Sequence, residues 1–147
     1  GADTALACDF IIADPQASFT WSYIHRGLIP DGGGMYFLPR RTGLARAKEL
    51  IFTGRRVDAT EALSLGIADR VSAPDTLLAQ AQAWARELAQ GSATALALGK
   101  TMLNQCYESS AEQLFMQGSQ AQGICYTSSE HRESVLAFLA KSAAKKP

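Results

Sequence analysis

The sequence predicts an α/β fold that is followed by an all-helical region. Through about residue 71, short stretches that favour helix and strand alternate, and turn signals such as Asp14-Pro15 separate them. After Pro74 the apolar residues recur at helical spacing instead. We therefore expect an α/β part over residues 1–73 and a helical part over residues 74–147.

The α/β part begins with a helix-compatible stretch over residues 2–8 and a compact apolar run over residues 9–14, which predicts a buried strand. Residues 17–21 could form a second short strand. Residues 22–34 lose periodicity and gather glycine and proline, so we expect an irregular loop that leads into a helix near residues 35–38. Loops of this kind often carry functional groups.

Two further helices and a strand complete the α/β part. Apolar side chains at helical spacing predict a helix over residues 42–52, with Gly54 as its stop signal. Asp58 stands three residues before Glu61, a spacing typical of a capping box at a helix start. That short helix should end before a strand over residues 67–71.

Three amphipathic stripes predict three helices in the second part. Their members are Leu77, Ala81, Trp84, Ala85 and Leu88, then Leu98, Met102 and Cys106, and finally Leu114, Gly118, Ala121 and Cys125. A fourth helix is expected over residues 129–140, before a lysine-rich end.

Composition narrows the class of protein. Apolar residues make up 47% of the chain and charged residues 19%, which is typical of a globular protein. No stretch approaches the roughly 20 apolar residues that cross a bilayer, so we expect no membrane span. Fourteen basic residues balance fourteen acidic ones, so no overall positive field favours nucleic acid. The three cysteines lack the close CxxC pairing of metal or redox sites, which suits a reducing cytoplasm.

Several segments follow one another in a distinctive order. They are Gly1-Ala-Asp-Thr-Ala-Leu-Ala-Cys-Asp-Phe-Ile-Ile-Ala13, Ala17-Ser-Phe19, Gly27-Leu-Ile-Pro-Asp-Gly-Gly-Gly34, Leu38-Pro-Arg-Arg-Thr-Gly43, Thr53-Gly54-Arg55 and Glu133-Ser-Val-Leu-Ala-Phe-Leu-Ala-Lys141. In order and spacing the chain resembles the C-terminal half of the enoyl-CoA hydratase/isomerase family, the crotonase superfamily. The resemblance implies the last part of a core of repeated ββα turns, followed by a helical region that packs subunits into a homotrimer or hexamer.

Members of this family bind an acyl-CoA thioester and stabilise the enolate formed from it with two backbone N–H groups, an oxyanion hole. The resemblance implies that one donor lies upstream of residue 1, and that the other belongs to a glycine turn whose last glycine is Gly1. The chain does not begin with Met, so we expect a truncated piece that cannot complete the oxyanion hole by itself. No metal or redox cofactor is implied.

Two positions match the glutamates that flank the substrate water in typical hydratases. Asp3 stands at the first position and Tyr23 at the second. A phenol is a poor base at neutral pH, so isomerisation is chemically more natural than hydration, and we interpret Tyr23 as a pocket wall. Asp3 either takes part in acid/base chemistry or complements the dipole of its helix from the first turn.

Asp31 is the leading catalytic candidate. Related isomerases use an aspartate in the Gly-Leu-x-Pro-Asp-Gly-Gly region as the base, and Asp31 occupies that position. The alternative is structural, because Pro-Asp-Gly is a common turn signal and Asp can cap the helix that follows. Gly32 and Gly33 would let the backbone approach the acyl group closely.

Phe138 and Lys141 match positions at which relatives contact the adenine and phosphates of CoA. An aromatic face packs on adenine, and an ammonium offsets phosphate charge. Alternatively, Phe138 is a core residue and Lys141 is a cation at a helix C-terminus.

The sequence thus predicts an acyl-CoA enzyme, with isomerase slightly preferred over hydratase. The alternative is a catalytically inactive piece that serves only folding or oligomerisation.

Overall fold

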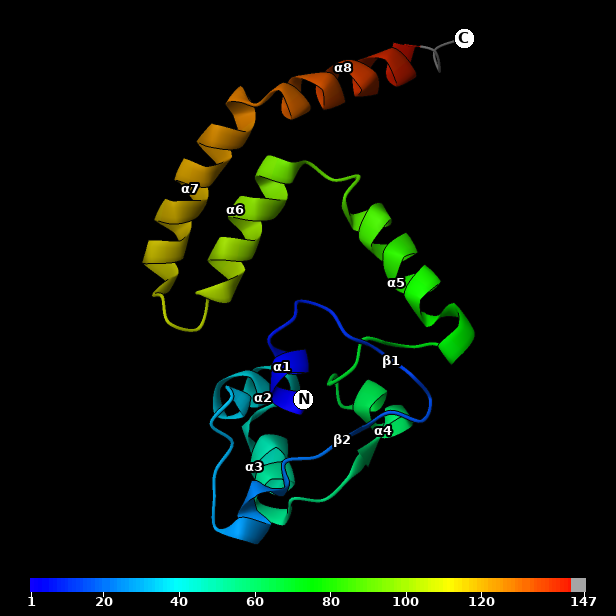
Figure 1. Ribbon diagram of the computed structural model, residues 1–147. Coiled ribbons are helices and arrows are strands. Elements are labelled where there is room, and N and C mark those ends of the chain that lie inside the picture. The colour runs from blue at the N-terminus through cyan, green and yellow to red at the C-terminus, as the bar shows by residue number, and fades with distance from the viewer. Residues whose placement is uncertain (144–147) are drawn as a thin grey trace. The chain divides into compact units, whose positions relative to one another are not determined.

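The computed structural model describes residues 1–143, and the chain divides into two compact units (Figure 1). The first unit is Gly1–Ala83, and the second begins at Trp84. The predicted change of character after residue 73 falls at the start of helix α5 (Pro74–Leu88), whereas the two compact units divide inside that helix. The predicted domain boundary stays a prediction.

The strands of the first unit form two small pairs. Strand β1 (Ile12–Ala13) pairs in parallel with β4 (Arg70–Val71), so that Ile12 is opposite Arg70. Strand β2 (Ser18–Phe19) pairs antiparallel with β3 (Val57–Asp58). The β1–β4 pair joins a segment near the start of the chain to one near residue 70.

The three predicted strands are shorter than the apolar runs that predicted them, because the flanking backbone groups have other partners, and β3 was not predicted. The backbone N–H of Ile11 donates to Asp69 Oδ2 at 2.6 Å, and that of Ile67 donates to the carbonyl of Ala62 at 2.9 Å. The strands expected over residues 9–14, 17–21 and 67–71 are therefore wrong in length. Their positions are confirmed.

Five helices surround these strands in the first unit. They are α1 (Ala2–Leu6), the 3₁₀ helix η1 (Ser22–Arg26), α2 (Gly34–Thr42), α3 (Leu44–Thr53) and α4 (Ala59–Ser64). Gly54 ends α3 with a left-handed φ of 58°, which confirms the predicted stop signal. The segment expected to be an irregular loop contains η1, and α2 runs through Pro39 instead of ending before it, because its middle packs into the core at Leu38.

The short helix α4 begins as predicted, at Asp58. Asp58 Oδ1 accepts a hydrogen bond from the backbone N–H of Glu61 at 2.8 Å. The reciprocal half of a capping box is not formed, because both Glu61 carboxylate oxygens accept hydrogen bonds from Arg55.

The buried core of the described chain lies entirely in the first unit. The largest side chains with essentially no exposed surface are Trp21, Leu38, Leu50, Val57 and Ile67. Burial of one such apolar side chain contributes about 1.5–3 kcal/mol to the free energy of unfolding. Side chains of α1, α2 and the segment around Trp21 pack together in this core.

The second unit consists of helices. The rest of α5 is followed by α6 (Ala93–Asn104), α7 (Ala111–Thr127) and α8 (Ser129–Ala143), as the stripes predicted. Helices α6 and α7 run side by side (Figure 1), and Met102 lies against the backbone at Gly118. The predicted stripes are half-buried along this contact, whereas no side chain described from Trp84 onward is fully buried.

Within residues 1–143, none of the helices combines the length and apolar character that a membrane span needs.

Candidate functional site

The strongest candidate site is built around Asp3. The first turn of α1 carries this residue into the protein, where it is only 6% exposed. Its Oδ1 atom accepts a hydrogen bond from Nε1 of Trp21 at 2.8 Å. Trp21 is fully buried and lies two residues after the end of β2. The position of the carboxylate is therefore set by two segments of the core.

A run of glycines closes over the other side of Asp3. A Cβ atom on Gly34 would overlap Asp3 Oδ1, and one on Gly32 would lie 3.0 Å from Oδ2. Gly33 adopts a φ of 102°, which side chains rarely tolerate. In the structure this run approaches the carboxylate of Asp3. Its predicted approach to the acyl group stays a prediction.

The second carboxylate oxygen of Asp3 is buried without a hydrogen bond. No donor in residues 1–143 reaches Oδ2. A buried polar atom left without a partner costs about 1–3 kcal/mol. An atom of this kind calls for an explanation, such as strain, a catalytic role, or a bound water or ion. Asp3 therefore has one oxygen that accepts a hydrogen bond from Trp21 and one without a hydrogen-bond donor among the described residues.

Asp31 lies one residue before the glycines, and its side chain is exposed. It stands in the turn that leads into α2, as the Pro-Asp-Gly signal predicted. The helix cap is Gly33, with no hydrogen bond from a side chain, so the alternative interpretation of Asp31 as the cap is wrong. Its catalytic role stays a prediction.

Gly1 and Tyr23, two of the predicted substrate-binding residues, lie in the first unit with Asp3. Gly1 is exposed at the N-cap of α1, and its carbonyl accepts a hydrogen bond from the backbone N–H of Ala5 at 3.0 Å. Tyr23 is half-buried in η1, two residues after Trp21. Their binding roles stay predictions.

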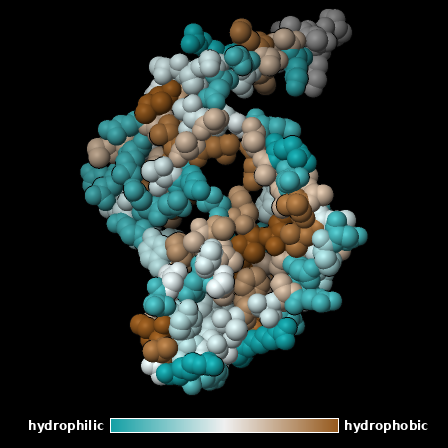
Figure 2. Space-filling view, in the orientation of Figure 1, coloured by the Kyte–Doolittle hydropathy of each residue, from teal (hydrophilic) through white to brown (hydrophobic). Residues whose placement is uncertain are grey.

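The predicted CoA contacts lie in the second unit, on α8. Phe138 is 69% exposed, so its interpretation as a core residue of this chain is wrong. Lys141 is exposed in the last turn of α8, where a cation complements the helix dipole. Contact of either residue with CoA stays a prediction. Figure 2 shows hydrophobic surface in patches between hydrophilic side chains.

Sequence reasoning missed Trp21. A signal was available, because the indole N–H of a buried tryptophan needs an acceptor, but the sequence does not say which acceptor. It also missed Arg41, whose guanidinium donates to the carbonyls of Cys8 and Asp9 at 3.0 Å each and pairs with Asp69 at 3.3 Å. Arg41 thereby ties the end of α2 to the segment that follows α1, and so keeps the two walls of the Asp3 site together.

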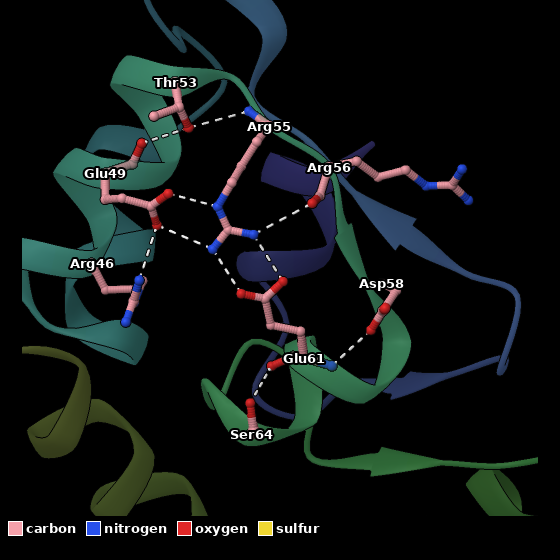
Figure 3. A network of polar contacts seen from close by, with 8 residues as sticks. All are labelled: Arg46, Glu49, Thr53, Arg55, Arg56, Asp58, Glu61 and Ser64. Carbon is pink, nitrogen blue, oxygen red and sulfur yellow. Dashed lines mark hydrogen bonds and ion pairs between the residues drawn. The ribbon is translucent and has the colours of Figure 1, made fainter.

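A second polar network lies in the same unit around Arg55 (Figure 3). Arg55 bridges Glu49 of α3 and Glu61 of α4 through hydrogen bonds of 2.6 to 3.1 Å. These hydrogen bonds hold the pKa values of both carboxyl groups below their usual range. Because both carboxylates that Arg55 contacts are paired with it, we interpret this network as a structural link between two helices.

Among residues 1–143, no group of three or more histidine, cysteine, aspartate or glutamate side chains is arranged to hold a metal ion.

Comparison with known proteins points to one family. A family model described as enoyl-CoA hydratase/isomerase matches residues 1–145. A probable enoyl-CoA hydratase from Rhizobium meliloti is 38% identical over 146 residues, which are 99% of this chain and 56% of that protein. Another from Mycobacterium tuberculosis is 44% identical over 108 residues, covering 74% of this chain and 41% of that protein.

Solved structures agree in fold. An enoyl-CoA hydratase/isomerase from Cupriavidus metallidurans matches with a TM-score of 0.91 and 38% identity, over 96% of this chain and 53% of that one. An enoyl-CoA hydratase from Bacillus anthracis matches with a TM-score of 0.91 and 33% identity, over 96% of this chain and 55% of that one. This chain spans about half the length of these relatives. It has the α/β crotonase-like fold, and it belongs to the enoyl-CoA hydratase/isomerase family.

Proposed function

We propose that the protein acts on acyl-CoA thioesters, and that Asp3 is the carboxylate that moves the proton. The observation that carries this proposal is the buried Oδ2 atom of Asp3, which has no hydrogen-bond donor within residues 1–143. A general base needs an oxygen that can accept the proton of the substrate, and Oδ2 has no hydrogen bond within residues 1–143 that would compete for it. The family to which the chain belongs supplies the substrate class.

Burial supports Asp3 over Asp31 as the base, which reverses the order that the sequence suggested. A carboxylate shielded from water interacts more strongly with a nearby substrate than an exposed one does. Asp3 is buried and held by Trp21, whereas Asp31 is exposed. Asp31 remains the second candidate, because it stands next to the glycines that line the Asp3 site.

The reaction we favour is isomerisation of an enoyl-CoA. The Asp3 carboxylate takes a proton from a carbon next to the double bond, and the C–H electron pair enters the conjugated system to form an enolate on the thioester oxygen. The resulting carboxylic acid returns the same proton to another carbon, and the double bond shifts. One carboxylate suffices for this sequence, and Tyr23 stands where hydratases have their second one.

The remaining parts of the proposal concern CoA and assembly. Phe138 and Lys141 would bind the adenine and phosphates, since both are exposed on α8. The second unit leaves large apolar side chains exposed, among them Tyr107 at 72% and Phe115 at 77%, and such surface is typical of an interface. We propose a homotrimer or hexamer in the cytoplasm, without a metal or redox cofactor, because acid/base and oxyanion chemistry need none.

The test is turnover of 3-enoyl-CoA and crotonyl-CoA by the full product of the gene, compared with Asp3→Asn and Asp31→Asn. Loss of the general base should lower kcat about 10²- to 10⁴-fold. We expect that loss for Asp3→Asn and a smaller one for Asp31→Asn. If Asp3→Asn keeps its activity while Asp31→Asn loses it, Asp31 is the base.

The same assay on the 147-residue chain addresses the alternative of an inactive module. That alternative has support of its own, because the chain spans about half the length of its relatives. Turnover by the 147-residue chain would exclude it.

A further inference from the structure

We propose that Trp21 is a positioning residue, whose indole N–H holds Asp3 Oδ1 so that Oδ2 alone transfers the proton. The inference rests on the proposed role of Asp3 and assigns separate tasks to its two oxygens. Trp21 would not touch the substrate.

A hydrogen bond from Trp21 fixes one oxygen of Asp3. Trp21 Nε1 lies 2.8 Å from Asp3 Oδ1, and both residues are buried. An indole N–H can donate but cannot accept, so it can pair only with an oxygen that has a lone pair to offer. A hydrogen bond to an ionised carboxylate is also among the stronger kinds in proteins. Oδ1 is therefore engaged by the protein, whereas Oδ2 has no hydrogen-bond donor within residues 1–143.

The glycine run packs against the Asp3 carboxylate and restricts its rotation. Gly34 approaches Oδ1 so closely that a Cβ atom there would overlap it, and Gly32 faces Oδ2. Rotation of the carboxylate would exchange the two oxygens only by breaking the bond to Trp21. Since Trp21 is itself fully buried in the core, its ring gives the carboxylate one fixed orientation. The oxygen that remains without a partner is then always the same one.

This arrangement has a consequence for the reaction. In the proposed isomerisation, Oδ2 takes the proton from one carbon and the same atom returns it to another. An oxygen held in one place can do both only if it stays within reach of both carbons. Reactions of this kind depend steeply on geometry, and a displacement of about 1 Å can cost about 100-fold in rate. Loss of the indole N–H should therefore reduce kcat and leave KM nearly unchanged.

The experiment replaces the N–H and as little else as possible. In the full gene product, Trp84→Phe first removes the only other tryptophan of this chain, which is the first residue of the second unit. Any further tryptophan that the full product carries is replaced in the same way. Trp21 is then exchanged for Phe, or for benzothienylalanine, which has the shape of tryptophan with sulfur in place of N–H. The second replacement tests the inference even if the first one fails to fold.

Three measurements separate the outcomes. We expect both Trp21 replacements to lower kcat about 10- to 100-fold with KM within about twofold, and Asp3→Asn to lower kcat about 10²- to 10⁴-fold. If Asp3→Asn loses turnover but the benzothienylalanine protein keeps it, the positioning role of Trp21 is refuted and the proposed function stands. If Asp3→Asn keeps full turnover, the proposed role of Asp3 fails and the role of Trp21 fails with it.

The hydrogen bond is checked without any turnover. In the Trp84→Phe protein, the indole ¹H–¹⁵N resonance of Trp21 should exchange slowly with solvent and should shift in Asp3→Ala. A resonance that does not respond to Asp3→Ala would overturn the inference whatever the kinetics show.

Discussion

The two units of this chain differ in how they use apolar side chains. The first unit buries its own, including Leu50 and Trp21, and forms a core. The second unit has helices of similar amphipathic character but no fully buried side chain among those described from Trp84 onward. Amphipathic helices are stable in proteins mainly when their apolar faces are covered. The first unit therefore contains the packing that holds a site, and the second presents surface that another chain or segment can cover.

The largest expected effect tests this difference directly. Leu50→Ala removes a fully buried side chain from the first unit and should lower the free energy of unfolding by about 2–5 kcal/mol. The matched change Leu103→Ala removes a side chain that is 71% exposed and should alter it by less than about 0.5 kcal/mol. Urea unfolding followed by far-ultraviolet circular dichroism, to which the helices of both units contribute, measures both. Equal effects would show that the two units do not differ in this way.

Two glycines provide the next comparison. Gly34→Ala would push a methyl group against Asp3 Oδ1 and the ring of Pro30, and should destabilise the first unit by about 1–3 kcal/mol. Gly123→Ala, on α7, meets no atom within 4 Å and should stabilise its helix by about 0.5–1 kcal/mol. Thermal unfolding followed by circular dichroism shows whether each substitution raises or lowers the Tm. A stable Gly34→Ala protein would contradict the close packing around Asp3.

The smallest expected effect concerns acid stability of the first unit. Arg55 lowers the pKa of Glu49 and Glu61 below the ordinary value of 4.5. A lowered pKa in the folded state stabilises the protein above the unfolded value, and this contribution is lost as the pH falls through the folded value. Arg55→Met should therefore reduce the drop in Tm between pH 6 and pH 3.

Arg46→Met is the matched control for that measurement. Arg46 contacts only Glu49 in this network, at 3.2 Å, and is more exposed than Arg55. It should change the pH dependence of Tm less. An equal change for both variants would mean that the bridge by Arg55 between α3 and α4 contributes no more to acid stability than the contact of Arg46 with Glu49.

Local signals in the sequence predicted much of the fold. The stop at Gly54, the helix start at Asp58 and the half-buried stripes of α6 and α7 all appear where they were expected. The lengths of the strands were not predictable, because they depend on which distant backbone groups compete for hydrogen bonds. Asp69, for example, takes the N–H of Ile11, which is 58 residues away.

The candidate site was predicted in its residue types but not in its arrangement. Asp3, Asp31 and the glycines were identified from the family resemblance, and the ranking of the two aspartates followed from motif alone. What distinguishes them in the structure is burial, and burial depends on neighbours that lie far away in the sequence. Trp21 became part of the site only through the hydrogen bond that it donates to Asp3 across 18 residues.

The sequence by itself determined the family, the change from a mixed α/β part to a helical part, and local signals such as the helix stop at Gly54 and the helix start at Asp58, because those depend on spacing and on neighbouring residues. Only the tertiary structure decided that one oxygen of Asp3 is held by Trp21 and the other is left free. The physical reason is that hydrogen bonds between distant segments form only when the packing of the core brings the segments together, and no local pattern records that packing.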